Sequence, residues 1–370
     1  MAHPSAELYG SDRVFCESAI ALTLAGWRVL VTLPTDGPLV ELLERHGVRV
    51  IFCPTPVLRK AALRPRGFLR LLGETARSVR PMWRLLRACR PDAVYVNTVT
   101  APLWLLLGRL TRRRVLAHVH EAEDAVPGPV RIALAAPLLA AGMVVVNSEA
   151  TGEVVRRSIP LLRRRIRLIY NGVPGPDRPP RDRDRPRDPV RITVVGRLSP
   201  RKGTDVAVDA VARLHKAGHA VTLDLVGSVF TGYEWYERQL RERIADAGLN
   251  GSVRLRGFDS DVWSAYEHAD IAVVPSRFEP FGNTSVEAQL AGVPVIVSAA
   301  QGLPETVAHG RAGTIVPVDA PDALAEAITE LIDDWPGTLQ IAAEAKRAAE
   351  TRFAPERYRQ DIAALFEAPQ

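Results

Sequence analysis

Two glutamates, Glu279 and Glu287, stand eight residues apart in a segment that could hold a phosphate between two sugars. An apolar run ends just before this segment, and the interruptions at Pro280 and Gly282 place Glu279 in a loop. Glu287 then lies about one turn into the helix that is expected to open near Asn283. The two carboxylates therefore do not share a helix face, because only the second lies on the helix.

The start of this helix offers an anion site. Backbone N–H groups in a first helical turn have no partner within the helix, and the helix dipole adds positive charge there. A carboxylate on one side of a bound phosphate suits ribose hydroxyls, and one on the other side suits the hydroxyls of an attached sugar. The alternative interpretation is a surface loop followed by a glutamate that the dipole favours. The residues expected at this site are Phe281, Gly282, Asn283 and Thr284.

Two cations, Arg197 and Lys202, flank the turn after the apolar run Arg191–Gly196. Ligands of open α/β folds bind at the carboxyl ends of the strands, and a guanidinium fork with an ammonium group suits a diphosphate there. Fixed cations would also speed the departure of a nucleotide diphosphate. The alternative is two solvated surface cations. Lysine is rare in this arginine-rich chain, which favours a specific role for Lys202.

Two histidines, His118 and His120, end an apolar run in the first half of the chain, and Glu121 follows them. Strand alternation points both imidazoles to the same side. A histidine satisfied within the core is the alternative for each, and it is the stronger interpretation for His118. The adjacent carboxylate makes His120 the preferred functional candidate.

Two glycines stand where the backbone could approach a ligand. Gly10 precedes a helical pattern and would let the backbone approach a diphosphate. Gly227, with Ser228, follows another apolar run and is expected to line the same sheet edge as Lys202. A tight turn is the alternative for Gly227.

Short apolar runs alternate with helical patterns along the whole chain. Most are continuous in Val, Ile and Leu, which is typical of parallel strands covered on both faces. This alternation predicts an α/β protein of two doubly wound, Rossmann-like domains that face each other across a cleft. Strands are expected in the first half at Arg28–Leu33, Val48–Cys53, Ala93–Asn97, Val115–His120, Met143–Asn147 and Arg167–Tyr170. In the second half they are expected at Arg191–Gly196, Val221–Gly227, Val253–Gly257, Ile271–Pro275, Val293–Ser298 and Thr314–Val318.

Composition divides the chain into segments. Residues 1–173 and 190–352 form the two expected domains, and residues 174–189 are dominated by Pro, Arg and Asp. Such a segment cannot bury apolar surface and is expected to be an extended, solvated linker. Residues 355–366 are amphipathic and are expected to form a helix, which either closes the second domain or packs back on the first.

The first domain lacks the apolar run with which a Rossmann domain should open. Met1–Leu8 contains no such run, and a helical pattern begins at Val14. The first strand is therefore apparently missing, either because it is absent or because the true start lies upstream. The upstream start is favoured, since this strand is central in a Rossmann sheet.

Composition excludes several classes of protein. A chain of 370 residues with 47% hydrophobic and 24% charged residues is expected to be a soluble protein of two domains. The net charge of +6 comes almost entirely from arginine beside abundant alanine, so we attribute it to genome composition and expect no nucleic-acid partner. Cys16, Cys53 and Cys89 lack metal-ligand spacing, and a cytoplasmic location is expected, since no signal peptide or membrane-spanning run is found.

Metal and cofactor motifs are weak or absent. Two Asp-x-Asp patterns occur, at Asp182–Asp184 in the linker and at Asp259–Asp261 before an expected helix, and we treat both as chance. No Gly-x-Gly-x-x-Gly follows a strand, which argues against a dinucleotide dehydrogenase. No Walker loop or Gly-x-Ser-x-Gly elbow is present.

Four motifs together resemble the large glycosyltransferase family 4, whose members are retaining enzymes of the GT-B fold. The segment Asp270–Ser298 resembles its donor-site signature, and Val195–Gly203 resembles its first turn in the nucleotide domain. Tyr170–Val173 resembles the lead-in to its hinge, and Gln301–Glu305 follows the fifth strand of the second domain as in the family. The first domain matches more loosely.

The resemblance implies a retaining glycosyltransferase that uses a nucleotide-diphosphate sugar and needs no bound metal or other cofactor for catalysis. It implies Glu287 on the ribose, Arg197 with Lys202 on the diphosphate, and Glu279 with the backbone near Gly302 on the sugar. His120 would hydrogen-bond and position that sugar. The acceptor would be a glycan, a lipid-linked or a small molecule with a hydroxyl group, in the synthesis of cell-envelope glycan, polysaccharide or glycolipid.

Two other functions stay open. A nucleotide-sugar 2-epimerase would use the same fold, and a non-catalytic module would bind the nucleotide sugar without transfer. Separately, residues 59–90 are rich in arginine with interleaved apolar residues such as Trp83, so they could lie on an anionic membrane. A helix face packed on the first sheet is the alternative.

Overall fold

The computed structural model describes residues 1–367 except 9, 59–61, 63, 64, 123, 125, 179, 180, 182 and 260. It divides into two compact units. The first contains residues 1–172 together with the segment from residue 355 onward, and the second contains Val173–Ala354.

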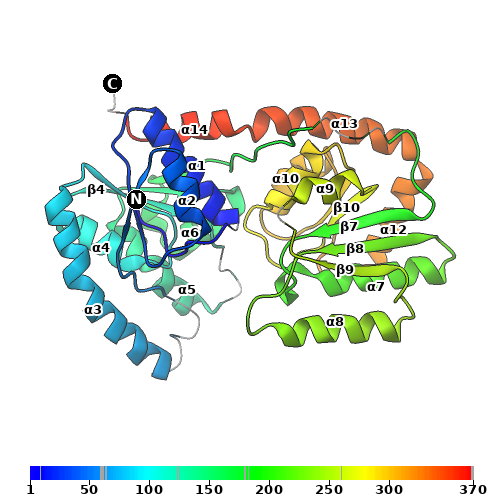
Figure 1. The fold of residues 1–370 in the computed structure, drawn as a ribbon, viewed down its shortest axis with the longest axis horizontal. Coiled ribbons are helices and arrows are strands. Elements are labelled where there is room, and N and C mark those ends of the chain that lie inside the picture. Colours follow the sequence, from blue (N-terminus) through cyan, green and yellow to red (C-terminus); the bar gives the residue numbers. More distant parts are fainter. Residues whose placement is uncertain are drawn as a thin grey trace. The chain divides into compact units, whose positions relative to one another are not determined.

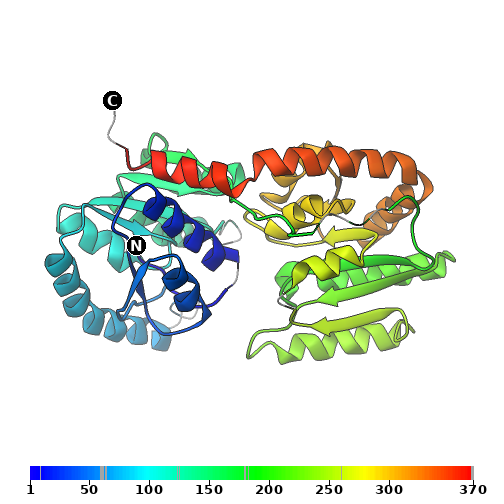
Figure 2. The ribbon, with the colours of Figure 1, turned by 45° about the horizontal axis from the view of Figure 1, so that its top comes forward.

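The second unit contains a six-stranded parallel sheet in the order β12-β11-β10-β7-β8-β9. Chain order reverses between β7 and β10, which is the doubly wound Rossmann arrangement. Helices cover both faces of this sheet (Figures 1 and 2). The strands are β7 (Val190–Val195), β8 (Val221–Val226), β9 (Val253–Gly257), β10 (Ile271–Val274), β11 (Val295–Ser298) and β12 (Thr314–Val316). The helices are α7 (Thr204–Lys216), α8 (Glu234–Asp246), α9 (Val262–Glu267), α10 (Asn283–Leu290), α11 (Leu303–Thr306), α12 (Pro321–Asp333) and α13 (Trp335–Arg352).

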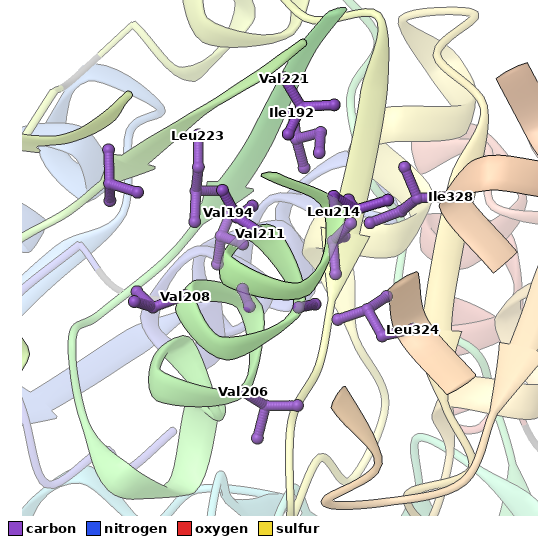
Figure 3. Packing of buried hydrophobic residues seen from close by; sticks show 14 of the residues in the cluster. Ile192, Val194, Val206, Val208, Val211, Leu214, Val221, Leu223, Leu324 and Ile328 are labelled. Carbon is purple, nitrogen blue, oxygen red and sulfur yellow. The ribbon is translucent and has the colours of Figure 1, made fainter. Parts of the chain in front are cut away.

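The core of this unit explains its strand pattern. Branched side chains of β7 and β8 meet the apolar faces of α7 and α12, as Figure 3 shows for Ile192, Leu223, Val211, Leu214 and Ile328. β10 and β11 are buried throughout, because helices lie on both of their faces. The continuous Val/Ile runs of the sequence thus reflect strands with no solvent-facing side.

The first unit has parallel strands in two groups, β1-β2 and β3-β4-β5-β6. They are β1 (Leu30–Leu33), β2 (Arg49–Phe52), β3 (Ala93–Val96), β4 (Arg114–Val119), β5 (Met143–Val146) and β6 (Ile166–Leu168). The helices are α1 (Gly10–Leu24), α2 (Pro38–Arg45), α3 (Pro65–Cys89), α4 (Pro102–Leu110), α5 (Gly128–Ala135), α6 (Glu149–Ser158) and α14 (Pro355–Ala364). All twelve strands predicted from the sequence are confirmed, with ends within two residues.

Three residues occupy the place of the missing first strand. Ala2 forms parallel bridges to Thr32 of β1 and to Val96 of β3. Its amide donates to the Tyr95 carbonyl at 2.8 Å, and its carbonyl accepts from the Asn97 amide at 3.0 Å. No strand is assigned before β1 in the described residues, yet this short segment joins β1-β2 to β3-β6 in the central Rossmann position.

The last helix belongs to the first unit. α14 packs along α1, and Figure 1 shows both helices near the top of that unit. Tyr358 is fully buried there, and its hydroxyl lies 2.5 Å from the Ser18 hydroxyl. Gly172 approaches the same helix closely, since a Cβ at that position would lie 2.8 Å from the Tyr358 Cβ.

The segment between the expected domains is not simply a solvated linker, which corrects the prediction for residues 174–189. Arg183 is 4% exposed, and its guanidinium donates to the carbonyls of Tyr266 at 2.8 Å and Ala269 at 3.1 Å. The indole of Trp335 donates to the Arg183 carbonyl at 2.8 Å. One arginine among many exposed ones therefore anchors this segment in the second unit. Asp182, of the first Asp-x-Asp pattern, lies outside the described residues, whereas Asp261 caps α9.

The basic helix α3 has two different halves. Met82 and Leu86 are buried in the first unit, and Trp83 packs against the same core, so Trp83 is not a free apolar side chain. Phe68, Leu69 and Leu72 are 51%, 67% and 49% exposed. No helix in the described ranges is long and apolar enough to cross a bilayer.

Arg183→Ala is expected to destabilise the second unit by about 2–4 kcal/mol, because buried carbonyls lose their donors. Urea unfolding monitored by tryptophan fluorescence would measure the loss. Arg185→Ala, at an exposed arginine of the same segment, is the control and should leave the midpoint unchanged. Equal midpoints for Arg183→Ala and the native chain would contradict the anchoring role.

Candidate active site

A largely buried ion pair lies at the carboxyl edge of the second sheet. The Lys202 ammonium contacts the Glu279 carboxylate at 2.5 Å, and the two side chains are 15% and 11% exposed. Lys202 ends the 3₁₀ turn after β7, and Glu279 lies in the loop after β10. These strands are neighbours at the point where chain order reverses, which is where open α/β folds bind their ligands.

Close backbone packing brings these two loops together. Gly203 adopts a left-handed conformation (φ +64°), and a Cβ there would lie 2.0 Å from the Pro275 carbonyl oxygen. Gly302 donates its amide to the Glu279 carbonyl at 3.0 Å, and a Cβ would lie 2.2 Å from the Pro280 oxygen. Both positions require glycine, because any side chain would push apart the loops that carry Lys202 and Glu279.

An arginine clamp that was not predicted from the sequence fixes the same loops. Arg277 forms two hydrogen bonds with the Asp205 carboxylate, at 2.9 and 2.8 Å. Its guanidinium also contacts Asp319 at 2.5 Å, and its amide donates to the Arg201 carbonyl at 2.8 Å. These bonds hold the 3₁₀ turn Pro200–Lys202 against the loop after β10.

The surroundings of Glu279 keep it ionised. Burial alone would raise its pKa, but the charges of Lys202 and Arg201, with hydrogen bonds from Lys202 and Ser276, lower the pKa below the ordinary value. The stability that the ion pair contributes is therefore lost only as pH falls through this depressed pKa. Near neutral pH the carboxylate accepts hydrogen bonds and does not donate them.

The second glutamate of the predicted pair lies one turn into α10. The single proton of the Tyr266 hydroxyl is shared between the Thr284 carbonyl at 3.0 Å and Glu287 Oε2 at 3.3 Å. Burial and the Glu287 charge raise the pKa of Tyr266 well above its usual value, so the phenol stays a donor. Tyr266 thus holds a half-buried carboxylate in one orientation.

The helix start between the two glutamates forms as predicted. α10 begins at Asn283, with Gly282 before it at φ +110°, and Asn283 and Thr284 are half-buried. Phe281 differs from the prediction that it binds a donor. Its side chain is 2% exposed and packs edge-on against Phe353 at 5.6 Å, so it supports the loop from below.

The remaining predicted residues of this unit line the same edge. The Arg197 guanidinium lies over the Phe230 ring, 3.1 Å from its centre. A guanidinium stacked in this way is held in place while it keeps its charge. Gly227 packs against the loop that carries Arg197, because a Cβ there would lie 2.0 Å from the Gly196 oxygen. Glycine is therefore required at position 227 by the close approach of the neighbouring loop, and not only by a tight turn.

In the first unit, His120 and His118 have different surroundings. His118 is fully buried, and its Nδ1 lies 2.5 Å from the Tyr95 hydroxyl. His120 is half-buried, and its ring lies tilted against that of His118, with 4.1 Å between their centres. Its Nε2 lies 3.0 Å from Asn97 Oδ1. Gly10 is exposed at the first residue of α1.

Glu121 is a structural carboxylate. It accepts from the amide of His120 at 3.1 Å and from the Thr98 hydroxyl, which ties the loops after β3 and β4 together. Burial raises its pKa, against the effect of these hydrogen bonds. The described residues contain no group of three His, Cys, Asp or Glu side chains arranged to hold a metal ion.

Sequence reasoning missed His3, Asp12, Asn97 and Arg277. Only their position could have indicated His3 and Asn97. Each directly follows a residue that pairs in the first sheet, namely Ala2 and Val96. No motif distinguished them from ordinary loop residues, because their partners lie far away in the chain.

Two family models match the chain in succession. The model "Glycosyltransferase Family 4" matches residues 9–174, and "Glycosyl transferases group 1" matches residues 178–351. These matches identify a glycosyltransferase, and the two Rossmann-like sheets have the GT-B fold. The chain belongs to glycosyltransferase family 4.

Known relatives agree with this assignment. The mannosyltransferase LpsB of lipopolysaccharide core biosynthesis from Rhizobium meliloti is 30% identical over 184 residues, which is 49% of this chain and 52% of that protein. Glycogen synthase of Mycobacterium tuberculosis is 34% identical over 184 residues, 49% of this chain and 43% of that protein. The chain thus aligns with about half the length of these curated relatives.

A solved structure covers more of the molecule. Anabaena Alr3699/HepE in complex with UDP and glucose matches with a TM-score of 0.80 and 25% identity, over 100% of this chain and 98% of that one. The same protein was also solved with UDP-glucose, at a TM-score of 0.80 and 25% identity, over 98% of this chain and 97% of that one.

Lys202→Ala is expected to lower the turnover of a nucleotide sugar at least tenfold. The protein loses one fixed cation that stabilises the leaving group, which raises the activation free energy by roughly 3 kcal/mol. Initial rates at saturating donor would measure the effect. Lys216→Ala, at an exposed lysine in α7, is the control. Near-normal turnover with Lys202→Ala, in a protein that melts like the native chain, would reject this donor site.

Proposed function

We propose that the protein transfers a sugar from a nucleotide diphosphate to a hydroxyl acceptor with retention of configuration. The observation that carries this proposal is the Lys202–Glu279 ion pair beside the start of α10. It places a cation, the first backbone amides of a helix and an ionised carboxylate at one edge of a Rossmann sheet. A pyrophosphate with a sugar on each side matches that set of groups.

Each group has a separate task in this proposal. Lys202 and Arg197 stabilise the charge that develops on the departing diphosphate. Glu279 accepts hydrogen bonds from hydroxyls of the transferred sugar, and Glu287 accepts them from the ribose. His120 hydrogen-bonds and positions the transferred sugar. Neither a metal ion nor another cofactor takes part.

The chemical step is a same-face substitution at the anomeric carbon. The bond from this carbon to the phosphate oxygen breaks, and the bond to the acceptor oxygen forms on the same face. The proton of the acceptor hydroxyl passes to the departing phosphate oxygen, so no side chain serves as general base. The UDP and UDP-glucose complexes of Alr3699/HepE make a UDP-sugar the first donor to test.

The first unit supports an acceptor with an apolar part. A cavity of about 100 Å³ lies at the carboxyl ends of β3 and β4, lined by Val99, Val119 and Leu138 among other apolar side chains. Glu121 and Arg131 also line it, and Arg131 Nε is buried with no hydrogen-bond partner among the described residues. A lipid-linked or otherwise amphipathic acceptor suits this mixture, as expected for envelope glycan or glycolipid synthesis.

A transfer assay tests the proposal. The chain is expected to release nucleoside diphosphate from one nucleotide sugar only when an acceptor is present, and NMR of the product should give the anomeric configuration of the donor. Consumption of donor without acceptor would instead support a 2-epimerase. Thermal stabilisation by a nucleotide sugar without transfer to any acceptor would support a non-catalytic binding module.

Association with an anionic membrane of the cytoplasmic face is a separate part of the proposal. Phe68, Leu69 and Leu72 are exposed on α3 beside Arg66 and Arg70, which combines apolar side chains with positive charge. Such a surface binds anionic lipid through both effects. The apolar residues needed are those of the first half of α3, since Trp83 packs on the core.

Leu69→Glu is expected to reduce binding to vesicles of phosphatidylglycerol at least fivefold, since one buried leucine contributes about 2 kcal/mol and the new charge is repelled. Vesicle co-sedimentation would measure it. Leu161→Glu, at an exposed leucine outside α3, should bind like the native chain. Unchanged binding with Leu69→Glu would contradict the membrane surface on α3.

A further inference from the structure

The first sheet also has a point where chain order reverses. β1 and β2 lie on one side of Ala2, and β3 to β6 lie on the other. Ligands of doubly wound folds bind outside the carboxyl ends of the strands at such a point. Four polar side chains meet there, and they come from four separate parts of the chain: His3, Asp12, Asn97 and His120.

These side chains form a continuous hydrogen-bonded array. His3 Nε2 lies 2.6 Å from Asp12 Oδ1, and His3 Nδ1 lies 3.1 Å from Asn97 Nδ2. Asn97 Oδ1 lies 3.0 Å from His120 Nε2. His3, Asp12 and Asn97 are at most 2% exposed, while His120 is half-buried. The array therefore connects a buried carboxylate to an imidazole that reaches the surface of the unit.

The array has one consistent direction of donation. An ionised Asp12 only accepts, so His3 carries its proton on Nε2 and keeps a lone pair on Nδ1. Asn97 donates its amide to that lone pair. The Ser11 carbonyl fixes the same amide orientation independently, because it lies 3.4 Å from Asn97 Nδ2 and would repel an oxygen there. Asn97 Oδ1 then faces His120, which must carry its proton on Nε2.

We propose that Asp12, His3 and Asn97 are positioning residues that hold His120 as its Nε2–H tautomer and leave Nδ1 as a hydrogen-bond acceptor. Burial lowers the pKa of His120 to about 3, against the opposing charge of Asp12. His120 is therefore neutral near pH 7, and the position of its one proton decides whether Nδ1 donates or accepts.

This inference rests on the proposed function for its consequence. If His120 faces the transferred sugar, an acceptor nitrogen binds a hydroxyl group and repels a carboxylate, which has no proton to donate. The array therefore favours a hexose that bears a hydroxyl group at that position and disfavours the corresponding hexuronate. Asp12 hydrogen-bonds His3 and therefore acts on His120 through two intervening side chains, those of His3 and Asn97.

The tautomer itself can be measured without any ligand. In the full chain labelled with ¹⁵N only at histidine, long-range ¹H–¹⁵N spectra distinguish the two tautomers, and His120→Gln assigns the signals. The native protein should give the Nε2–H pattern. Asn97→Leu removes the acceptor next to His120, and Asp12→Leu removes the acceptor at the far end, so both should give a mixture of tautomers.

Two matched variants separate this role from a structural one. Asn97→Asp keeps an acceptor toward His120, and its second oxygen keeps a donor toward His3 when it carries a proton, so the Nε2–H tautomer should be retained. Asp92→Leu changes an exposed acid of the same unit and should leave the spectrum unchanged. In transfer assays Asn97→Leu and Asp12→Leu should lower kcat about tenfold with little change in donor KM, whereas Asn97→Asp should stay within about threefold.

The outcomes are distinct. A single Nε2–H signal for His120 that persists in Asn97→Leu would overturn the proposal, even if Asp12→Leu failed to fold. Equal losses of kcat in Asn97→Leu and Asn97→Asp would also overturn it. Tautomers that respond as described, in a native chain that transfers no sugar, would support the array and contradict the proposed function instead.

Discussion

A contact between the Lys202 ammonium and the Glu279 carboxylate joins the loops after two neighbouring strands of the second sheet. Buried charges are costly unless they are paired, so the two loops must keep the ammonium and the carboxylate in contact. The left-handed Gly203, the close approach at Gly302 and the Arg277 clamp all serve to bring the two loops within reach. A diphosphate at this edge would meet a cation whose position is already fixed.

The two units handle polar groups at the sheet edge differently. In the second unit, opposite charges face each other directly, and hydrogen bonds from Ser276 add to the charge of Lys202. In the first unit, the Asp12 carboxylate and the His120 imidazole are separated by His3 and Asn97, and most of the array is shielded from water. A direct pair provides charge, whereas a neutral array provides a fixed direction of hydrogen-bond donation.

The sequence predicted those features that depend on local patterns. Strand positions followed from continuous Val/Ile runs, and the start of α10 followed from Gly282. It failed where distant residues decide the outcome. Arg183 looked like one of many solvated arginines, and only carbonyls near residues 266–292 make it an anchor. Phe281 looked like a ligand contact, but Phe353, 72 positions away, buries it.

The first sheet shows the same limit in another form. Three residues are too few for any apolar periodicity, so Met1–His3 could not be predicted as a sheet element. Their place is evident only from pairing with Thr32 on one side and Val96 on the other. The His3–Asn97 contact was hidden for the same reason, since it depends on this register.

The short central segment has a consequence for local stability. At the seam between β1-β2 and β3-β6, Ala2 forms one bridge to each side, whereas four residues pair in each of the β1-β2 and β3-β4 ladders. Fluctuations that open a sheet begin where the fewest bonds must break together. Since His3 and Asn97 belong to the seam, each opening would also break the hydrogen bonds that hold the His120 imidazole in one orientation. Slow local opening of the sheet would therefore make the orientation of this imidazole vary with time.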